Sequence, residues 1–282
     1  MSTMSGATGP AGATGTPDAT GISGAATASQ LPAAPAAIAV RAATKRFGAV
    51  VALDSVDLEV RRGEVLALLG DNGAGKSTLI KCLSGVHRLD DGVIEMDGRP
   101  IVIHSPAQAR ALGIETVYQD LALFDNLGPA ANFYAGREQA GPAWLPTWLR
   151  FLDRKAMADQ TGRLLDRLEV GLPDMRTPVG LLSGGQRQAV AVARAAAFAS
   201  NVVILDEPTA ALGVRESRRV LDLIARLREA NYAVIVISHA LDHVIDIADR
   251  AVVLRRGRKV GEEVPSRENQ QRIVSLIVGG EG

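Results

Sequence analysis

The chain has 282 residues, of which 47% are hydrophobic, so it can bury at least one substantial core. Lys plus Arg and Asp plus Glu number 31 each, so the formal net charge is 31 − 31 = 0, and no overall field attracts nucleic acid or anionic lipid. The single cysteine, Cys82, excludes an internal disulfide and a cysteine-based metal cluster, and it fits a reducing compartment.

The first 36 residues are rich in Gly, Ala, Thr, Ser and Pro, with Asp18 as their one charged residue. Such a segment has too few large side chains to offset the entropy of ordering it. We therefore expect a disordered tail over 1–36, followed by one folded domain over 37–282. The tail has no basic start and no compact apolar core, so it does not resemble a secretory signal. No apolar run in the chain reaches the ~18 residues that a membrane-spanning helix requires.

Short β-rich runs follow the tail, and their spacing predicts a series of strands. The predicted strands are residues 37–44, 56–60, 64–70, 92–98, 99–105 and 114–119. The Asp97-Gly98 pair is a hairpin signal between two of them. The third strand runs into a glycine-rich stretch, and residues 78–85 after that stretch have helical spacing.

The second half of the chain changes character twice. Residues 121–182 read as helices with Gly and Pro breaks, which predicts an inserted helical subdomain. After them, apolar strands alternate with amphipathic helices over residues 201–208, 215–231, 232–239, 240–248 and 249–257. Continuous apolar strands separated by helices indicate a parallel sheet covered on both faces. The predicted fold is therefore α/β, with a mostly parallel sheet, an antiparallel β subdomain and the helical insertion.

The stretch "GDNGAGKS", residues 70–77, fits the phosphate-loop pattern G-x-x-x-x-G-K-[ST] between a strand and a helix. Its glycines let backbone N–H groups point at a phosphate, and the helix N-terminus adds partial positive charge. Lys76 supplies a full charge for the β and γ phosphates, and the Ser77 hydroxyl can ligate Mg²⁺. Thr78 has two possible roles, a contact with phosphate or packing within the helix. The candidate phosphate-binding residues are Gly70, Asp71, Asn72, Gly73, Ala74, Gly75, Lys76, Ser77 and Thr78.

Two later strands each end on side chains that suit nucleotide chemistry. The apolar run before Asp206 and Glu207 delivers both carboxylates to the edge of the sheet where ligands bind. Asp206 suits a Mg²⁺ shell, and Glu207 suits polarisation of an attacking water. His239 ends the next apolar strand and could hydrogen-bond a γ-phosphate and hold the water. A lone histidine there is usually structural, but a phosphate loop in the same chain favours the catalytic interpretation.

A second glycine-rich turn, "GLLSGGQRQA" at residues 180–189, also has the composition of an anion-binding turn before a helix. Its Ser183 lies 183 − 76 = 107 positions after Lys76. The phosphate loop, "LLSGGQ", "VVILDEPTA" and "ISH", in this order, resemble the nucleotide-binding domain of ABC transporters. The resemblance covers residues 38 to about 265 and is implied by four motifs in series.

The resemblance implies further assignments for ATP and Mg²⁺. Phe47 matches the position of an aromatic ring that stacks on adenine, with a core phenylalanine as the alternative. Gln119 matches the glutamine that reaches Mg²⁺ and the attacking water, with a solvated loop residue as the alternative. The family also implies a head-to-tail dimer, in which one copy closes over the γ-phosphate held by the other copy. The closing residues are Ser183, Gly184, Gly185 and Gln186.

With one copy of each motif, the chain is expected to need a second copy of itself, most simply as a homodimer. Sequence details around residues 70–78 and 207–216 look most like ATPase subunits of bacterial sugar importers. That likeness implies transmembrane permease subunits as partners, indirectly a substrate-binding protein, no nucleic acid, and the cytoplasmic face of the inner membrane. Gly213 departs from the family, which usually has an aspartate there that couples the two sites.

Two alternatives are kept beside the importer. An ABC ATPase acting in DNA repair or on ribosomes commonly has coiled coils or fused domains, and neither pattern occurs in this sequence. An unrelated P-loop kinase or GTPase leaves the "LLSGGQ" stretch without a role. The insert at residues 141–152 contains Trp144 and Trp148, which either dock a partner or pack inside the helical subdomain.

Overall fold

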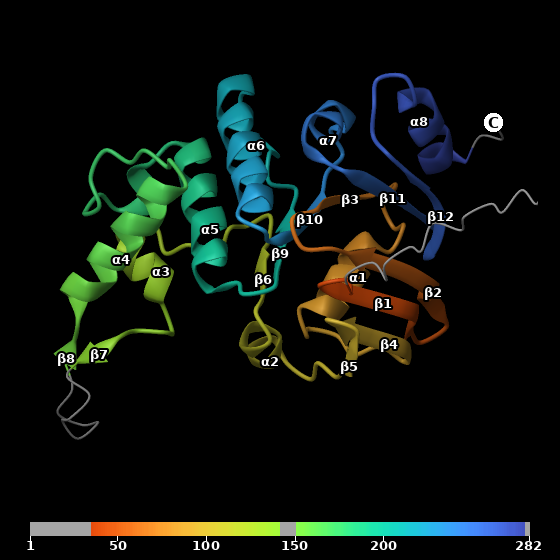
Figure 1. The fold of residues 1–282 in the computed structure, drawn as a ribbon, viewed down its shortest axis with the longest axis horizontal. Coiled ribbons are helices and arrows are strands. Elements are labelled where there is room, and N and C mark those ends of the chain that lie inside the picture. Colours follow the sequence, from red (N-terminus) through yellow and green to blue (C-terminus); the bar gives the residue numbers. More distant parts are fainter. Residues whose placement is uncertain (1–34, 142–150, 280–282) are drawn as a thin grey trace, which may run out of the picture. The chain divides into compact units, whose positions relative to one another are not determined.

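The computed structural model describes residues 35–141 and 151–279, all of which belong to one compact unit, Pro35–Gly282 (Figure 1). Almost all of the predicted tail, residues 1–34, lies outside the described residues. Trp144 and Trp148 lie outside them as well, so the two interpretations of the tryptophan pair stay open.

A six-stranded sheet forms the centre of this unit, in the order β12-β11-β3-β10-β9-β6. Its strands are β3 (Val65–Leu69), β6 (Ile114–Val117), β9 (Val202–Asp206), β10 (Ala233–Ile237), β11 (Arg250–Arg255) and β12 (Arg258–Glu263). Five of them run parallel, and only the edge strand β12 pairs antiparallel. Every residue of β3 and β10 is buried, which explains why these strands read as unbroken apolar runs. The predicted mostly parallel α/β sheet is confirmed.

Successive residues of β3 point into different parts of the core, as the two-residue period of a strand requires. Leu66 and Leu68 pack in a cluster with helix α1, while Val65 joins the cluster formed with α5 and α6. Leu69 packs in a third cluster with residues of α7 and α8. The helices of the described residues are α1 (Lys76–Leu83), α2 (Pro106–Ala111), α3 (Pro129–Tyr134), α4 (Arg154–Arg167), α5 (Gly184–Phe198), α6 (Val214–Glu229), α7 (Leu241–Ile247) and α8 (Gln270–Val278).

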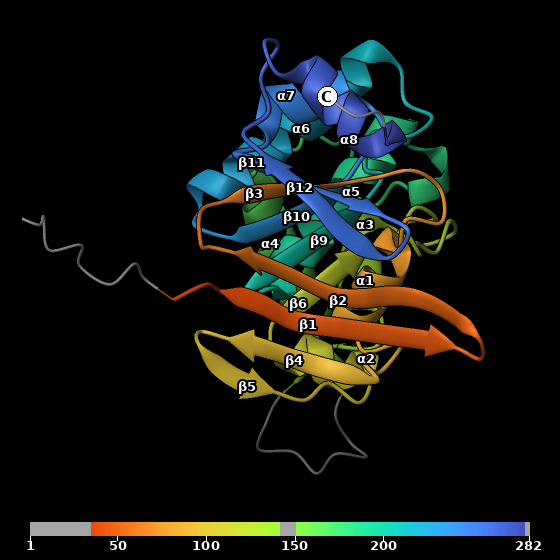
Figure 2. The same cartoon turned by 90° about the vertical axis from the view of Figure 1, so that its right-hand side faces the viewer.

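A four-stranded antiparallel sheet packs beside the central one, in the order β2-β1-β4-β5 (Figure 2). Its strands are β1 (Ile38–Phe47), β2 (Val50–Val60), β4 (Asp91–Met96) and β5 (Arg99–Ile101). Asp97 and Gly98 join β4 to β5 with φ values of 48° and 74°, the left-handed pair that a two-residue hairpin prefers. The hairpin predicted from this dipeptide is therefore confirmed.

Between β6 and α5 the chain forms the short helix α3, the longer α4 and a two-stranded ribbon. The ribbon pairs β7 (Ala140–Gly141) with β8 (Phe151–Leu152), and a 3-10 turn, η2 (Val179–Leu181), leads into α5. Asn132, fully buried on α3, donates from Nδ2 to the carbonyls of Phe124, Leu127 and Gly128. The side-chain amide of Asn132 thus holds the loop at residues 124–128 in place. Helices α3 and α4 pack on α5.

Candidate functional site

Four neighbouring strands deliver the predicted motifs to one edge of the central sheet. In the parallel register, Ile237 of β10 lies beside Leu68 of β3 on one side and Asp206 of β9 on the other. On the far side of β9, Val117 of β6 lies beside Leu205. Because parallel strands end at the same edge, the segments that follow these residues emerge together.

The residues that leave this edge are those of the sequence motifs. The phosphate loop follows β3, His239 lies two residues beyond β10, Glu207 lies one beyond β9, and Gln119 lies two beyond β6. The structure therefore brings the phosphate loop, both carboxylates, the histidine and the glutamine to one place. Strand pairing thus brings Lys76 and His239, which are 163 residues apart in the sequence (239 − 76), to the same edge of the sheet.

The phosphate loop has a backbone that its glycines make possible. Gly70 and Gly75 have φ values of 146° and 107°, a region that L side chains rarely adopt. A Cβ at Gly70 would lie 2.3 Å from the carbonyl oxygen of Leu254, and one at Gly75 would lie 2.8 Å from that of Ala52. Gly75 caps α1 without a side-chain hydrogen bond, so the first N–H groups of the helix keep free donors for an anion.

Lys76 is a buried cation at the start of α1, with 6% of its surface exposed. Its Nζ donates to the carbonyl oxygens of Gly70 and Asp71 at 2.7 and 3.0 Å. Among the described residues, no carboxylate lies within ion-pair distance of it. Burial lowers the pKa of Lys76, and the charges of Glu207, Asp71 and Asp206 oppose that shift. A buried ammonium that meets only carbonyls is a fitting receptor for phosphate oxygens.

Asp206 and Glu207 stand side by side at the end of β9. Burial raises the pKa of the Asp206 carboxyl, and the neighbouring Glu207 charge raises it further, while Lys76 opposes both effects. Glu207 has a φ of 51°, and its backbone N–H donates to the carbonyl of Ile237 at 3.0 Å. This left-handed backbone is a strained position for a non-glycine residue at a functional site.

The Glu207 carboxylate meets His239 directly, with 2.9 Å between Oε1 and Nε2. The two side chains are 26% and 47% exposed, so a substrate can reach both of them. A carboxylate held against an imidazole at the mouth of a phosphate loop has the geometry to orient and polarise a water.

The oxygen donors at this edge fit Mg²⁺, which prefers oxygen ligands and keeps several waters. The Ser77 hydroxyl follows β3, the Asp206 carboxylate ends β9 and the Gln119 amide follows β6, all at this edge. Within the described ranges, no cluster of three His, Cys, Asp or Glu residues could hold a metal. A metal bound at this edge would therefore depend on such mixed oxygen donors together with those of a nucleotide.

Replacing Asp206 with asparagine should stabilise the nucleotide-free chain. A raised pKa means that the fold disfavours the ionised carboxylate, so this penalty is present above the folded pKa and disappears as the pH falls. We expect the melting temperature of the variant to exceed that of the parent at neutral pH. Scanning calorimetry across pH checks this: the gain should shrink under acid conditions, and a less stable variant at neutral pH would contradict it.

Phe47 and Gln119 both lie where solvent and ligand can reach them. Phe47 ends β1 with 44% of its surface exposed, which rules out the core-packing alternative. The His87 ring packs edge-on against it at 5.1 Å, and Lys45 Nζ lies 5.5 Å from its ring centroid. Gln119 is exposed in the turn after β6.

The second glycine-rich turn begins α5 with a reciprocal capping box. Ser183 Oγ accepts from the N–H of Gln186 at 3.2 Å, and Gln186 Oε1 accepts from the N–H of Ser183 at 3.0 Å. Helix α5 packs on α3, α4, α6, β6 and β9, whereas α1 packs on β2. In Figure 1, β6 and β9 lie between α1 and α5, so this turn is not brought to the phosphate loop of its own chain.

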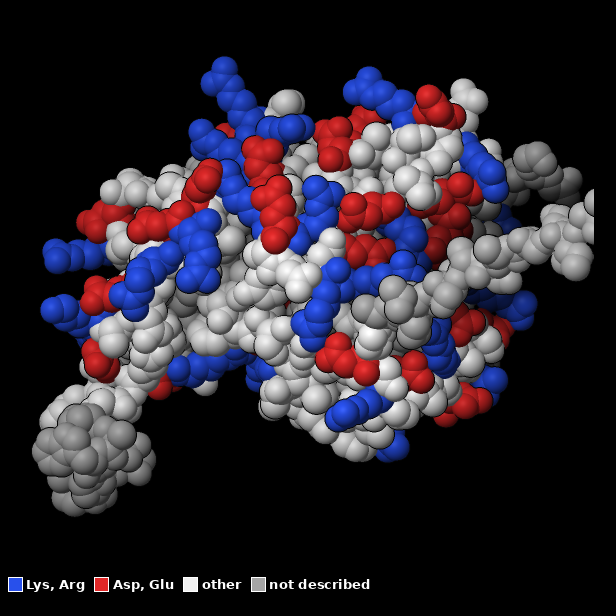
Figure 3. All heavy atoms as spheres, viewed as in Figure 1, with Lys and Arg blue, Asp and Glu red and all other residues white. Residues whose placement is uncertain are grey.

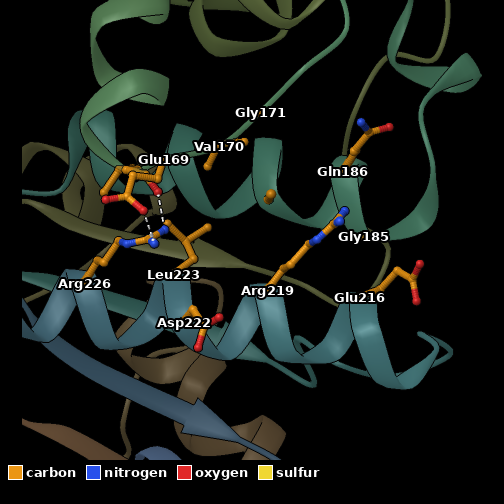
Figure 4. Close-up of a pocket in the computed structure, with 12 residues that line it drawn as sticks. Glu169, Val170, Gly171, Gly185, Gln186, Glu216, Arg219, Asp222, Leu223 and Arg226 are labelled. Carbon is orange, nitrogen blue, oxygen red and sulfur yellow. Dashed lines mark hydrogen bonds and ion pairs between the residues drawn. The ribbon is translucent and has the colours of Figure 1, made fainter.

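A hollow of about 320 Å³ lies behind this turn, between α5, α6 and residues 168–171 (Figure 4). Arg226 crosses it, donates to the Leu168 carbonyl at 2.8 Å and pairs with Glu169. Two of the charges that line the hollow thus neutralise each other, and it has no equivalent of the phosphate-loop backbone.

Glycine is required at Gly185 because Glu216 of α6 lies against it. A Cβ at Gly185 would lie 2.8 Å from Glu216 Cβ, so glycine lets α5 approach α6 closely. A Cβ at Gly213 would lie 2.7 Å from Glu216 Oε2, the mobile end of that side chain, and Gly213 has an ordinary φ of −70°. Nothing in the structure explains the departure from the family pattern at Gly213.

The segments that follow β9 and β10 share a second contact, in addition to Glu207–His239, that the sequence did not predict. Thr209 Oγ1 lies 3.0 Å from His243 Nδ1 on α7. The sequence does show a histidine four residues after His239. Its partner could not be predicted, because the sequence does not show which residues lie near it in the fold.

The comparisons with known proteins agree with this geometry. The sequence profile described as "ABC transporter" matches residues 53–210, more than half of the chain. The fructose import ATP-binding protein of Rhizobium meliloti is 47% identical over 243 residues, covering 86% of this chain and 94% of the relative. The xylose/arabinose import ATP-binding protein of Sulfolobus acidocaldarius is 44% identical, covering 84% and 92%.

Among solved structures, the fold resembles the ADP conformation of an ATP-binding cassette of an ABC transporter. The TM-score is 0.72 at 24% identity, over 87% of this chain and 99% of that one, which supports the fold alone. No helix in the described part of the chain is long and apolar enough to span a membrane. The chain belongs to the ABC transporter family, as one of its ATP-hydrolysing subunits.

Proposed function

We propose that this ATPase subunit energises the import of a carbohydrate. The support is its identity of 44% or more, over nearly their full lengths, with relatives named for sugar import. Those two relatives are named for fructose and for xylose/arabinose, so the likeness indicates the class of cargo and not one sugar. Substrate choice would belong to the permease and to a substrate-binding protein that this chain only powers.

We further propose that each ATP is held between two copies of the chain. The observation that carries this is the placement of α1 and α5 on different sides of β6 and β9 in one copy (Figure 1). In the described part of one copy, the phosphate loop contains the buried Lys76, and the Ser183 turn begins α5 on the other side of β6 and β9 (Figure 1). A head-to-tail homodimer places the Ser183 turn of each copy over the phosphates held by the other, so ATP itself joins the subunits.

Within that site, the residues would divide the work. Lys76 and the loop N–H groups bind the β and γ phosphates, and Phe47 stacks on the adenine ring. Ser77, Asp206 and Gln119 would hold Mg²⁺, whose charge neutralises the phosphate oxygens. Glu207 polarises the attacking water, and His239, whose Nε2 lies 2.9 Å from Glu207 Oε1, contacts the γ-phosphate once ATP is bound.

Dimer closure would act on a permease through the predicted helical subdomain, residues 121–182. A groove of about 680 Å³ beside the segment after Gln119 supports this. Tyr118, Phe133 and Phe198 give it apolar walls, and the exposed Arg110 adds positive charge. Arg137 pairs with Glu115 inside the groove, and Arg194 donates to the carbonyls of Leu121 and Ala122. We propose that a cytoplasmic helix of the permease docks there, with the subunit on the cytoplasmic face of the inner membrane and reopening after hydrolysis.

The alternative of a non-transport ABC ATPase receives no matching observation. On the face shown in Figure 3, Lys and Arg alternate with Asp and Glu over the described residues, so this face offers no continuous basic track for a nucleic-acid backbone.

Affinity capture of the tagged subunit from detergent-solubilised membranes tests the transport proposal. We expect integral membrane permease subunits to be retained in stoichiometric amounts. An Arg110→Glu variant should lose them while keeping ATP binding, because it reverses an exposed charge that lines the groove and breaks no ion pair among the described residues. Recovery of nucleic acid or ribosomal proteins without a membrane subunit would overturn the proposal.

A further inference from the structure

Two side-chain contacts join the segment after β9 to the segment after β10, and they follow each other along both segments. Glu207 meets His239 at 2.9 Å, and two residues further on Thr209 meets His243 at 3.0 Å. Both contacts bridge strands that are neighbours in the sheet. The first involves groups proposed to act in hydrolysis, whereas the second has no place in that chemistry.

The second contact is placed to hold its segment in position. His243 is half-buried in the first turns of α7, and the turn before that helix is fixed by Ser238 Oγ, which accepts from the N–H of Ala240 at 3.1 Å. On the other side, Glu207 has a strained backbone, and the N–H of Ala210 donates to its carbonyl. A strained turn keeps its conformation only where its surroundings fix it.

The two contacts differ in what a nucleotide would do to them. If His239 turns to a γ-phosphate, its contact with Glu207 is weakened or lost at the moment when both groups must stay aligned. Thr209 and His243 are not among the residues proposed to bind phosphate, so their contact can persist through that exchange. Of the two contacts, Thr209–His243 would then be the one that still holds the two segments in position relative to each other.

We propose that His243 is a positioning residue for ATP hydrolysis: through Thr209 it holds the His239 segment against the Glu207 segment while His239 changes partner. This rests on the proposed role of His239 in the site. His243 itself touches no reacting atom, so its loss should slow turnover without weakening nucleotide binding.

A double-mutant cycle tests the link. We expect Thr209→Val and His243→Ala each to lower kcat for ATP about tenfold, with KM and the calorimetric Kd for ATP unchanged. Because both changes remove the same bond, the double variant should be no slower than either single one. Thr209→Ser keeps the hydroxyl and should retain near-native kcat. Melting temperatures within about 3 °C of the parent would show that all variants fold.

The ion pair between Arg218 and Asp246 provides a matched control. This pair joins α6 to α7, with 3.3 Å between Arg218 Nη1 and Asp246 Oδ2, but both side chains are exposed. Asp246→Ala should therefore leave kcat unchanged. An equal loss of kcat in Asp246→Ala, or independent additive losses in the Thr209 and His243 variants, would show a general structural role and overturn the proposal.

One further variant separates this inference from the proposed site. If His239→Ala abolishes turnover while His243→Ala leaves kcat at the native value, the positioning role fails and the site stands. If His239→Ala itself turns over normally, the proposed chemistry fails and the positioning role fails with it.

Discussion

Glu207→Gln should abolish ATP turnover while leaving ATP binding intact. The amide keeps the shape of the side chain beside His239, but it cannot polarise a water as a carboxylate does. General-base assistance is typically worth about 10²- to 10⁴-fold, and we expect a loss of kcat in that range. Binding should survive because the phosphates are held by Lys76 and the loop backbone, which the substitution does not touch.

Phosphate release at saturating ATP measures the loss, and calorimetry measures the affinity. Glu229→Gln is a suitable control, since it makes the same chemical change on an exposed residue at the end of α6. With hydrolysis blocked, ATP should also hold the proposed dimer closed. Native turnover in the Glu207 variant would remove this residue from the mechanism.

Lys76→Ala should weaken ATP binding by about 10- to 100-fold. The ammonium is buried and has only carbonyl partners, so a nucleotide provides its first anionic contact among the described groups. Hydrogen bonds to charged groups contribute about 1.5–3 kcal/mol, which corresponds to this range of affinity. The fold itself should not suffer greatly, because the substitution also removes the cost of a buried cation.

Titration calorimetry with a non-hydrolysable ATP analogue checks this prediction without interference from turnover. Lys81→Ala is the matched control, because Lys81 lies on the same helix with its side chain exposed. Only the Lys76 variant should lose affinity. An unchanged dissociation constant in that variant would refute its role at the phosphates.

Much of the site could be predicted from the sequence because its parts follow local rules. A phosphate loop needs glycines and a lysine at fixed spacing, and Asp206, Glu207 and His239 each follow an unbroken apolar strand. Parallel strands end at one edge, so predicting a parallel sheet already predicts that these side chains come together. The hairpin at Asp97-Gly98 was predictable for the same reason, since two residues determine its turn.

The contacts that were not predicted depend on long-range approach. Glycine at 70 is required by the Leu254 carbonyl, 184 positions away (254 − 70), and only the packed sheet shows that neighbour. Glycine at 185 is required by the side chain of Glu216, 31 positions away (216 − 185), which only the packing of α5 on α6 shows. The Thr209–His243 contact likewise depends on how α7 lies against the turn that follows β9. Such pairs have no signature in a single sequence.

In the proposed dimer, ATP is held between Lys76 of one copy and Ser183 of another. Light scattering with ATP, using Glu207→Gln and the double variant Glu207→Gln, Ser183→Arg, tests it most directly. The first should double its mass when ATP is added. The second should stay monomeric and bind ATP with the affinity of a single copy, because Ser183 lies away from its own phosphate loop. ATP-dependent doubling of the double variant, or a loss of ATP affinity in its monomer, would contradict the claim.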